Sequence, residues 1–434
     1  MAQLGLASAQ GPSIGRSVDA DLLIRGILFV AVFLTVCISF HPFQSLAEPQ
    51  PFLSDAGDLV NQIGFSVLFL ALAAVTARHE SGRLRPLLRP ILLAVLAWCA
   101  VTAVASWEPS LAGRRLAFTL MYMSISAMAL LLPKNLRHFS ELMAAVALIV
   151  LATCYLGVLL APSLSIHQAT DFLEPEHAGS WRGVFSQKNT AGAMMVLFIF
   201  IGMFVARTRS FALGAFIVVP ALIFLFFTQS KTDISALPLV LILAAAIARG
   251  RGPAVAIMLV IALVAVVNLL SVGSIYFEPV RNLVETVMPD ATFTGRTEIW
   301  DLALRYAAQR PILGYGFSAF WGTEEAMFGL GENLSWVNGA LDAHNAYVNL
   351  ALTIGIPGLI LAMLWLVALP LIDYYRSPSE PSTAPLKMLF LRICLFGAYG
   401  SCFESLYFSV GGIWFFLITA TFGLRYLSVS RVAT

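Results

Sequence analysis

Charged residues are scarce in this chain of 434 residues, of which only 12% are Asp, Glu, Lys or Arg and 59% are hydrophobic. A soluble domain carries about 25% charged residues, so this composition excludes a soluble globular protein. The apolar stretches run for about 17–25 residues, which suits helices that cross a bilayer and is too long for barrel strands. The chain is therefore predicted to be an integral membrane protein built from helices.

Disulfide, metal and nucleotide motifs are also missing. The five cysteines lie in apolar stretches, and an odd number in that setting gives neither a disulfide framework nor the ligand spacing of a metal site. We expect them to pack as small hydrophobic side chains. No P-loop, dinucleotide-binding fingerprint or nucleophile elbow occurs in a suitable context. We therefore expect neither a metal nor another cofactor.

Twelve apolar stretches predict an all-α, polytopic transmembrane helical bundle. The predicted spans are 22–40, 59–77, 90–106, 116–132, 142–162, 190–206, 211–228, 234–248, 253–272, 346–372, 388–406 and 411–427. The first of them lacks a small-residue cleavage site and is therefore not a signal peptide. The short turn at 229–233 leaves a miscount open. No internal repeat is convincing enough to suggest the inverted halves common in transporters.

The distribution of Lys and Arg sets the predicted orientation. With the N-terminus inside, 17 of the 26 Lys and Arg residues fall on the inner side, many of them in short loops. Both termini are thus predicted to be cytoplasmic. The predicted parts are a cytoplasmic tail (1–21), spans 1–9 (22–272) with an outer loop at 163–189, a large periplasmic loop (273–345), and spans 10–12 (346–434) with a Pro- and Ser-rich cytoplasmic linker (373–387).

The loop at 273–345 is far longer than a connection between two helices requires. Within it, Thr297–Gln309 has helical spacing but is too polar to span a membrane, so it is expected to lie against the bundle or the membrane boundary. We expect Thr297 to cap its start, Asp301 to pair with Arg305, and Gly314 to help end it. A segment of this length and chemistry predicts a functional site.

Cations on the outer side are informative because they run against the orientation rule. Arg182, Lys188, Lys231 and Arg296 lie in three separate outer segments, next to small or aromatic residues. Arginine offers a planar fork to phosphate and lysine a compact charge, so the set suits a diphosphate at the membrane surface. For any single cation, neutralising a carboxylate or a lipid headgroup is the simpler interpretation.

His344 lies between the long loop and the next span, where a histidine can act as a general base. Asp342 and Asn345 are positioned to hold it, although a solitary histidine is more often simply packed or solvated. No second His or Cys lies at zinc-ligand spacing. Glu404 is predicted to lie inside a span near its outer end, where a functional role and snorkelling to the surface are equally plausible.

Other aromatic and histidine residues receive simpler interpretations. We expect tryptophans near span ends to form an interfacial belt. The residues concerned are Trp107, Trp181 and Trp321. Three loop histidines lack any supporting pattern, namely His41, His167 and His177.

The chain resembles the O-antigen ligase/Wzy polymerase superfamily, and in particular the ExoQ-type bacterial exopolysaccharide polymerases. The resemblance rests on motifs that occur in the right order and on the right side. They are WRGVFSQKNTAG (181–192), SKT (230–232), TGRTEIW (294–300) followed by RPILGYGFSAFW (310–321), and DAHNAYVNLALTIGIPG (342–358). Each motif is weak alone, but together they cover roughly residues 180–370 around the long loop.

The resemblance implies a metal-independent, inverting glycosyltransferase of the bacterial inner membrane whose active site is periplasmic. It implies that His344 assists the attacking hydroxyl, with Arg296 also catalytic and Arg182, Lys188 and Lys231 binding the diphosphate. Asp342, Asn345 and Asn189 would support these residues. The chain departs from the family pattern at two of these motifs. Gln187 stands where many relatives have a histidine, and Lys231 replaces the commoner arginine and loses its fork.

The implied partners are a glycan donor on undecaprenyl diphosphate, a glycan acceptor and membrane lipid, with a chain-length regulator and a flippase from the same pathway and no nucleic acid. One alternative is a ligase that moves glycan to lipid A core or to protein. Another is a secondary transporter or lipid-linked glycan flippase, in which Glu404 and Arg392 would line the pathway. The lack of repeats and the outer position of the cations weigh against transport.

Overall fold

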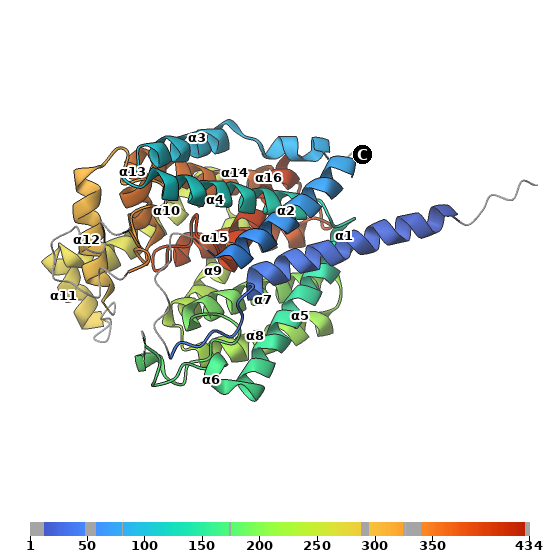
Figure 1. Cartoon of the computed structure of the whole chain (residues 1–434), viewed down its shortest axis with the longest axis horizontal. Coiled ribbons are helices and arrows are strands. Elements are labelled where there is room, and N and C mark those ends of the chain that lie inside the picture. The colour runs from blue at the N-terminus through green and yellow to red at the C-terminus, as the bar shows by residue number, and fades with distance from the viewer. Residues whose placement is uncertain are drawn as a thin grey trace, which may run out of the picture.

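The computed structural model describes residues 13–47, 58–79, 81–172, 175–287, 295–323, 326 and 340–429. In these ranges the regular structure is helical, and a bridge between Ile166 and Trp181 is the only β-type pairing. The helices lie side by side in one bundle, with two shorter helices at one end (Figure 1). The predicted all-α polytopic bundle is confirmed.

Sixteen α-helices occur in the described residues. The first eight are α1 (Ser13–Ile38), α2 (Leu59–His79), α3 (Pro90–Val104), α4 (Pro109–Ala129), α5 (Leu136–Leu160), α6 (Pro162–Ser165), α7 (Lys188–Thr208) and α8 (Phe211–Thr228). The others are α9 (Lys231–Arg249), α10 (Pro253–Ser271), α11 (Glu278–Val287), α12 (Arg296–Gln309), α13 (Ala346–Met363), α14 (Leu369–Arg376), α15 (Ala384–Gly400) and α16 (Gly412–Val429).

Every predicted span corresponds to a helix in the structure. Nine helices of the described part are long and apolar enough to cross a membrane. The remaining predicted spans are α3, α4 and α15, and α3 and α15 are only 15 and 17 residues long. α8 and α9 are separate helices, because Gln229 turns the chain with a φ of +53°. The possible miscount at 229–233 is thereby removed.

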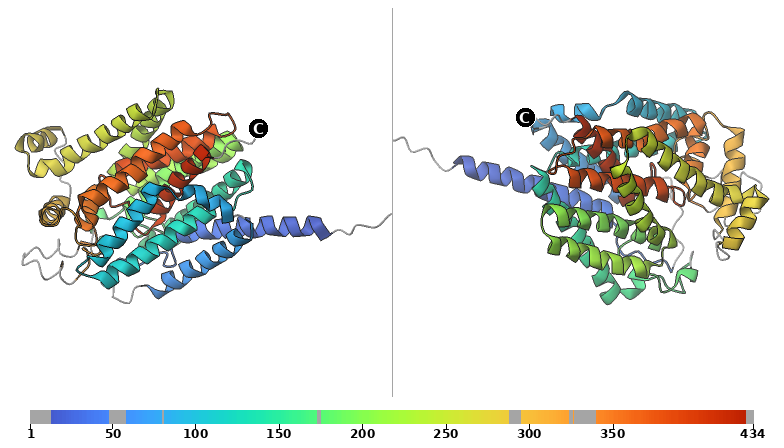
Figure 2. Two further views of the ribbon diagram at one scale, coloured as in Figure 1. Left: turned by 90° about the horizontal axis from the view of Figure 1, so that it is seen from above. Right: turned by 180° about the vertical axis from the view of Figure 1, so that it is seen from behind.

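The centre of the bundle is α7, of which 78% of the most apolar window is buried. Its side chains are apolar on nearly every face, which is the pattern of a helix surrounded by protein. α5, α8, α9 and α15 all pack against it. The peripheral helices leave large apolar side chains exposed, as α2 does at Leu59, Ile63 and Leu70. Figure 2 shows this layering from two further sides.

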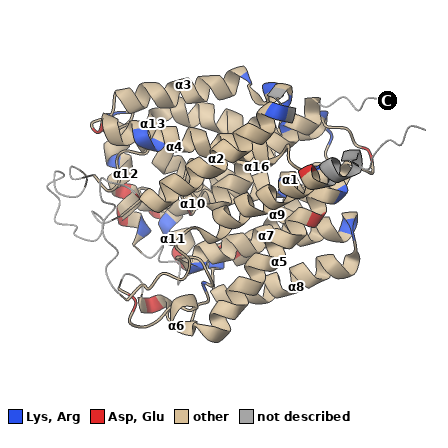
Figure 3. Cartoon of the chain, turned by 45° about the vertical axis from the view of Figure 1, so that its right-hand side comes forward, with Lys and Arg blue, Asp and Glu red and all other residues tan. Residues whose placement is uncertain are grey.

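The two described ends of the chain lie on the side of the bundle opposite α11 and α12 (Figure 1). α1 projects beyond the bundle at that side, and residues 13–21 of the predicted tail are helical rather than unstructured (Figure 2). Charged residues gather near the helix ends, while the long helices are almost free of charge between them (Figure 3). Which of the two sides is cytoplasmic stays a prediction.

Part of the long loop folds as expected. α12 buries Ile299 and Ala303 against the rest of the molecule, and the predicted pair between Arg305 Nε and Asp301 Oδ2 is present at 3.0 Å. The predicted cap is wrong, because α12 begins at Arg296, one residue before Thr297. Gly295 leads into it with a φ of +73°, a conformation that favours glycine.

The motif at 310–321, which follows α12, bonds to α13 at a break in that helix. This contact fixes the position of α12. The backbone of the segment 311–316 bonds to α13 through Tyr315 N and Leu352 O (3.0 Å), Gly316 N and Thr353 O (2.9 Å), and Ile356 N and Pro311 O (2.8 Å). The break needs Gly355, whose φ is +70° and whose Cβ, if it had one, would lie 1.9 Å from Ile312 O. The chain leaving α12 is thereby held against α13.

The three tryptophans expected in an interfacial belt pack against other parts of the protein, and their place relative to a membrane stays a prediction. Trp107 donates from Nε1 to Ala319 O at 2.6 Å, and Trp321 donates to Asn349 Oδ1 at 2.8 Å. Trp181 stacks on Phe227 with ring centroids 4.4 Å apart. Trp107 and Trp321 thus use their ring N–H groups to hold neighbouring segments, and Trp181 contributes ring packing.

The segment 373–387 is more than the plain linker that its composition predicted. Asp373 is buried at the end of α14 and accepts two hydrogen bonds from Arg89, at 2.7 and 2.8 Å, and one from Ser428 at 2.9 Å. Lys387 is buried at the other end and donates to Ser377 O at 3.1 Å. The Asp373 cluster joins the entry to α3 with α14 and α16.

Replacing Asp373 by Ala should lower the melting temperature of the detergent-solubilised protein strongly. The change leaves Arg89 unpaired in a mostly buried position, which typically costs about 3–5 kcal/mol. Arg137→Ala is the matched control, since Arg137 is 73% exposed in its pair with Glu141. The control should melt like the native protein. Equal melting temperatures for the two variants would contradict this account of the cluster.

Candidate active site

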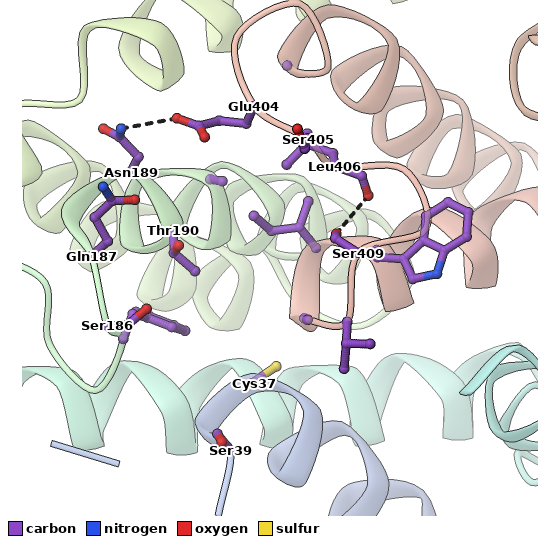
Figure 4. A pocket seen from close by; sticks show the side chains of 18 of the residues that line it. Cys37, Ser39, Ser186, Gln187, Asn189, Thr190, Glu404, Ser405, Leu406 and Ser409 are labelled. Atoms are coloured by element: carbon purple, nitrogen blue, oxygen red, sulfur yellow. Dashed lines mark hydrogen bonds between the residues drawn. The ribbon is translucent and has the colours of Figure 1, made fainter. Parts of the chain in front are cut away.

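The centre of the candidate site is the carboxylate of Glu404. α15 ends at Gly400, so Glu404 lies in the connection to α16 and not inside a span as predicted. Its Oε1 accepts hydrogen bonds from Arg296 NH2 at 2.7 Å and from Asn189 Nδ2 at 3.1 Å. Its Oε2 lies 3.0 Å from His344 Nδ1. Figure 4 shows the carboxylate and Asn189 facing each other on one wall of a cavity.

Arg296 is held in place by both parts of its guanidinium. Besides its bond to Glu404, its NH1 donates to the carbonyl oxygen of Phe403 at 2.7 Å. Because Arg296 is the first residue of α12, this pair of bonds ties the start of that helix to the connection between α15 and α16. The same helix donates from Trp300 Nε1 to Ala343 O at 2.9 Å, next to His344.

His344 stands at a sharp turn just before α13. Its φ is +46°, and its backbone N–H donates to Asp342 Oδ1 at 2.6 Å. The positive φ is uncommon for a residue with a side chain, and such strain often marks a functional position. The turn directs the ring at Glu404 and leaves the side chain 30% exposed.

Asn345 locks this turn to its surroundings. Its Oδ1 accepts from the backbone N–H groups of Tyr347 and Val348, at 3.0 and 3.1 Å, and so caps α13. Its Nδ2 donates to Asn268 Oδ1 at 2.8 Å and to Cys402 O at 2.9 Å. The amide is buried and uses every hydrogen-bonding position it has, which fixes His344 relative to α10 and to the loop of Glu404.

Opposing effects set the pKa values of the histidine and the carboxylate. Burial lowers the pKa of His344, but the hydrogen bond that it donates to Glu404 and the charges of Asp342 and Glu404 outweigh this effect and leave the pKa raised. Burial raises the pKa of Glu404, but the charge of Arg296 and the bond and charge of His344 outweigh it and leave the pKa lowered. Glu404 is thus an ionised acceptor that favours a proton on His344.

A cavity of about 420 Å³ adjoins these residues. His344, Asp342, Glu404 and Asn189 line it on one side, and the C-terminal end of α1 together with the connection before α16 lines it on the other. Figure 4 shows Ser186, Gln187, Ser405 and Ser409 around the same space. The walls therefore combine polar side chains with two histidines, His344 and His41, of which His344 contacts the Glu404 carboxylate.

Asn189 connects the site to the buried start of α9. Its Oδ1 accepts from Ser230 Oγ at 3.2 Å, and Ser230 Oγ also lies 2.7 Å from Asp233 Oδ2. Asp233 is buried and lines the cavity, although no motif had drawn attention to it. These contacts fix the direction in which the amide of Asn189 points its NH₂ group at Glu404.

The structure brings together five of the eight predicted site residues. They are Arg296, His344, Asp342, Asn345 and Asn189. Arg182 is not among them: it is 1% exposed and donates to Phe185 O at 3.1 Å and to Gln44 O at 2.7 Å. Burial lowers the pKa of its guanidinium. In this structure Arg182 braces the loop before α7.

The two predicted lysines also lie outside the cavity wall. Lys188 begins α7, and its backbone N–H donates to His167 Nε2 at 3.2 Å. Lys231 begins α9 and is exposed. Of the described residues that line the cavity beside His344, none is Lys or Arg. A diphosphate role for Arg182, Lys188 or Lys231 stays a prediction.

Sequence reasoning underrated two residues at this site. Glu404 was underrated because it lies near the end of an apolar stretch that was predicted to be a span. Its acidic side chain at that position was the only signal in the sequence. His167 is buried, with its Nδ1 3.0 Å from Asp171 Oδ2 while Nε2 accepts the N–H of Lys188. This arrangement makes His167 a brace for the start of α7, and the i,i+4 spacing to Asp171 was its only sequence signal.

Residues 194–363 match a protein-family model described as O-Antigen ligase. The matched range includes Arg296, Asp342, His344 and Asn345, while Glu404 lies outside it. A comparison with curated proteins found no match.

Replacing Glu404 by Gln should lower the pKa of His344, because the variant removes the negative charge at 3.0 Å. In the native protein the raised pKa means that a protonated His344 stabilises the fold below the ordinary histidine pKa of about 6.5. That contribution is lost as the pH rises through the raised pKa. NMR titration of the histidine ring in detergent measures the pKa of His344 in the native protein and in the variant. An unchanged pKa in the variant would contradict the assignment. Asp342→Asn should produce a smaller shift in the same direction.

Proposed function

Since this chain belongs, through its matched domain, to the O-antigen ligase/Wzy superfamily of glycosyl-transferring membrane enzymes, we propose that it polymerises oligosaccharide repeat units carried on undecaprenyl diphosphate. The product is an exopolysaccharide, and the reaction takes place at the periplasmic face of the bacterial inner membrane. The proposal rests above all on the contact between His344 and Glu404 at the edge of a polar cavity.

The proposed step is an inverting displacement at the anomeric carbon of the donor. A hydroxyl oxygen of the acceptor sugar forms the new bond while the bond from the anomeric carbon to the diphosphate oxygen breaks. The electron pair of the broken bond leaves with undecaprenyl diphosphate. The hydroxyl proton passes to His344, whose Nδ1 is engaged with Glu404, so Nε2 is the atom that receives it.

Glu404 supports this transfer through charge. As His344 takes the proton, its ring becomes positive, and the adjacent carboxylate stabilises that charge where it forms. Arg296 acts on His344 indirectly, because its guanidinium keeps Glu404 ionised and fixed in position. A diphosphate is already a good leaving group, so no second carboxylic acid of the glycosidase kind is needed. The proposed step likewise requires no metal ion.

His344→Ala and Arg296→Ala should abolish polymer formation while the protein still inserts and accumulates. Loss of a general base typically costs 10²–10⁴-fold in rate, and loss of Arg296 removes the partner that keeps Glu404 ionised. Lys231→Arg, at an exposed position, should be tolerated. The measurement is the chain length made by purified protein from the lipid-linked repeat unit in detergent. Near-normal chain length in either alanine variant would contradict the site assignment.

The same assay separates the rival functions. A polymerase lengthens chains when it receives only the lipid-linked repeat unit. A transporter or flippase leaves chain length unchanged in detergent, where no compartments exist. A ligase transfers glycan only after lipid A core or a protein acceptor is added, and that outcome would replace polymerisation as the function.

A further inference from the structure

A second cavity, of about 670 Å³, lies beside the candidate active site. It is enclosed by residues at the C-terminal end of α1, the N-terminal parts of α2 and α4, and Gly322, Val410 and Gly411. Under the predicted orientation these helix parts are all at the outer side of the membrane. No motif of the sequence pointed to this space.

The lining of the second cavity changes in character along its helices. Near the starts of α2 and α4 it contains Asn61 and the arginines Arg114 and Arg115. One to two turns further along the same helices it contains Phe65 and Met121. Both helices begin at the predicted outer side, so the polar end faces the water boundary and the apolar end lies deeper. Such a gradient fits an amphiphile with an anionic head and a hydrocarbon tail.

Charge distinguishes the two cavities. Arg114 and Arg115 are the only Lys or Arg residues in the described lining of either cavity. The one acidic residue of the second lining, Asp58, lies 2.8 Å from His41 Nε2 through its Oδ2. Arg115 also donates to Ser318 O and so ties α4 to the segment that follows α12. Among the described lining residues, the polar end of the second cavity thus holds two basic side chains and one acidic side chain.

The two cavities share part of their walls. Val36, Ser39, Val410 and Gly411 line both of them. We call these four shared residues the ridge. A molecule whose head lies at Arg114 crosses this ridge to reach the cavity of His344. The pair of His41 and Asp58 joins the two linings as well, since His41 lines the first cavity and Asp58 the second.

We propose that the second cavity binds the lipid-linked acceptor: its isoprenoid chain lies along Phe65 and Met121, its diphosphate at Arg114 and Arg115, and its oligosaccharide reaches over the ridge to His344. This inference rests on the proposed polymerase function. The donor must place its diphosphate at the reacting carbon, but the acceptor carries its diphosphate at the far end of its oligosaccharide. A second anion site at a distance from His344 is what such an acceptor requires.

The shape of the deeper end favours one lipid chain. The apolar lining there is Phe65 of α2 together with Phe118, Met121 and Tyr122 of α4, and Phe65, Phe118 and Tyr122 are in contact through ring pairs 5.5–6.3 Å apart. So few apolar side chains accommodate a single isoprenoid chain more readily than the several acyl chains of lipid A. The proposal therefore commits to an isoprenoid diphosphate as the lipid of the acceptor.

The test compares two acceptors at a saturating concentration of a lipid-linked donor whose own acceptor hydroxyl is blocked: the lipid-linked repeat unit and the same oligosaccharide freed from its lipid. Arg114→Gln should raise the KM for the lipid-linked acceptor by about tenfold, the size expected for one charge-assisted hydrogen bond. Its kcat and any transfer to the free oligosaccharide should be unchanged. Arg305→Gln is the control, because Arg305 is an outer arginine paired with Asp301 that lines neither cavity, and its KM should equal the native value.

A second variant tests the tail, and the outcomes separate the two proposals. Met121→Asn should raise the KM for the long isoprenoid acceptor but not for one with a short isoprenoid. An unchanged KM in Arg114→Gln, or an equal loss with the free oligosaccharide, would overturn the second site while leaving the enzyme a polymerase. Native protein that transfers glycan to neither acceptor would overturn the proposed function itself. Arg114→Gln should melt at the native temperature, since Arg114 is exposed.

Discussion

One carboxylate, that of Glu404, accepts hydrogen bonds from three parts of the chain that are far apart in sequence. The donors are Asn189 at the start of α7, Arg296 at the start of α12 and His344 just before α13. A partly buried charge of this kind is destabilised when one of its partners is removed, since the remaining charge is then less well compensated. The active-site geometry therefore depends on how accurately the fold delivers these three donors.

Contacts between helix starts and loop backbones hold the three donors to Glu404 in place. The break in α13 at Gly355 receives the segment after α12, and Asn345 ties the turn of His344 to Cys402 O, two residues before Glu404. α7, the most buried helix, provides the fixed wall on which Asn189 stands. The candidate catalytic side chains thus lie on turns and helix ends, and the packed apolar helices fix the positions of those ends.

The sequence was sufficient for the bundle and for about half of the site. Long apolar runs predict helices because a helix satisfies its own backbone hydrogen bonds inside a bilayer. The periodicity of the sequence also predicted α12. Arg296 and His344 were found because charge in an outer loop is conspicuous. Arg182 was equally conspicuous, yet it bonds to backbone carbonyls, and charge alone does not reveal which way a side chain points. Glu404 was underrated because hydropathy does not show that α15 ends at Gly400.

The central claim is that Arg296 acts on His344 through Glu404, and a double-mutant cycle on turnover tests it most directly. The four proteins are the native chain, Arg296→Gln, Glu404→Gln and the variant with both changes, assayed at saturating lipid-linked substrate. If Arg296 acts through the carboxylate of Glu404, the double variant loses little more activity than the worse of the two single variants. Losses that multiply as independent effects would contradict the account.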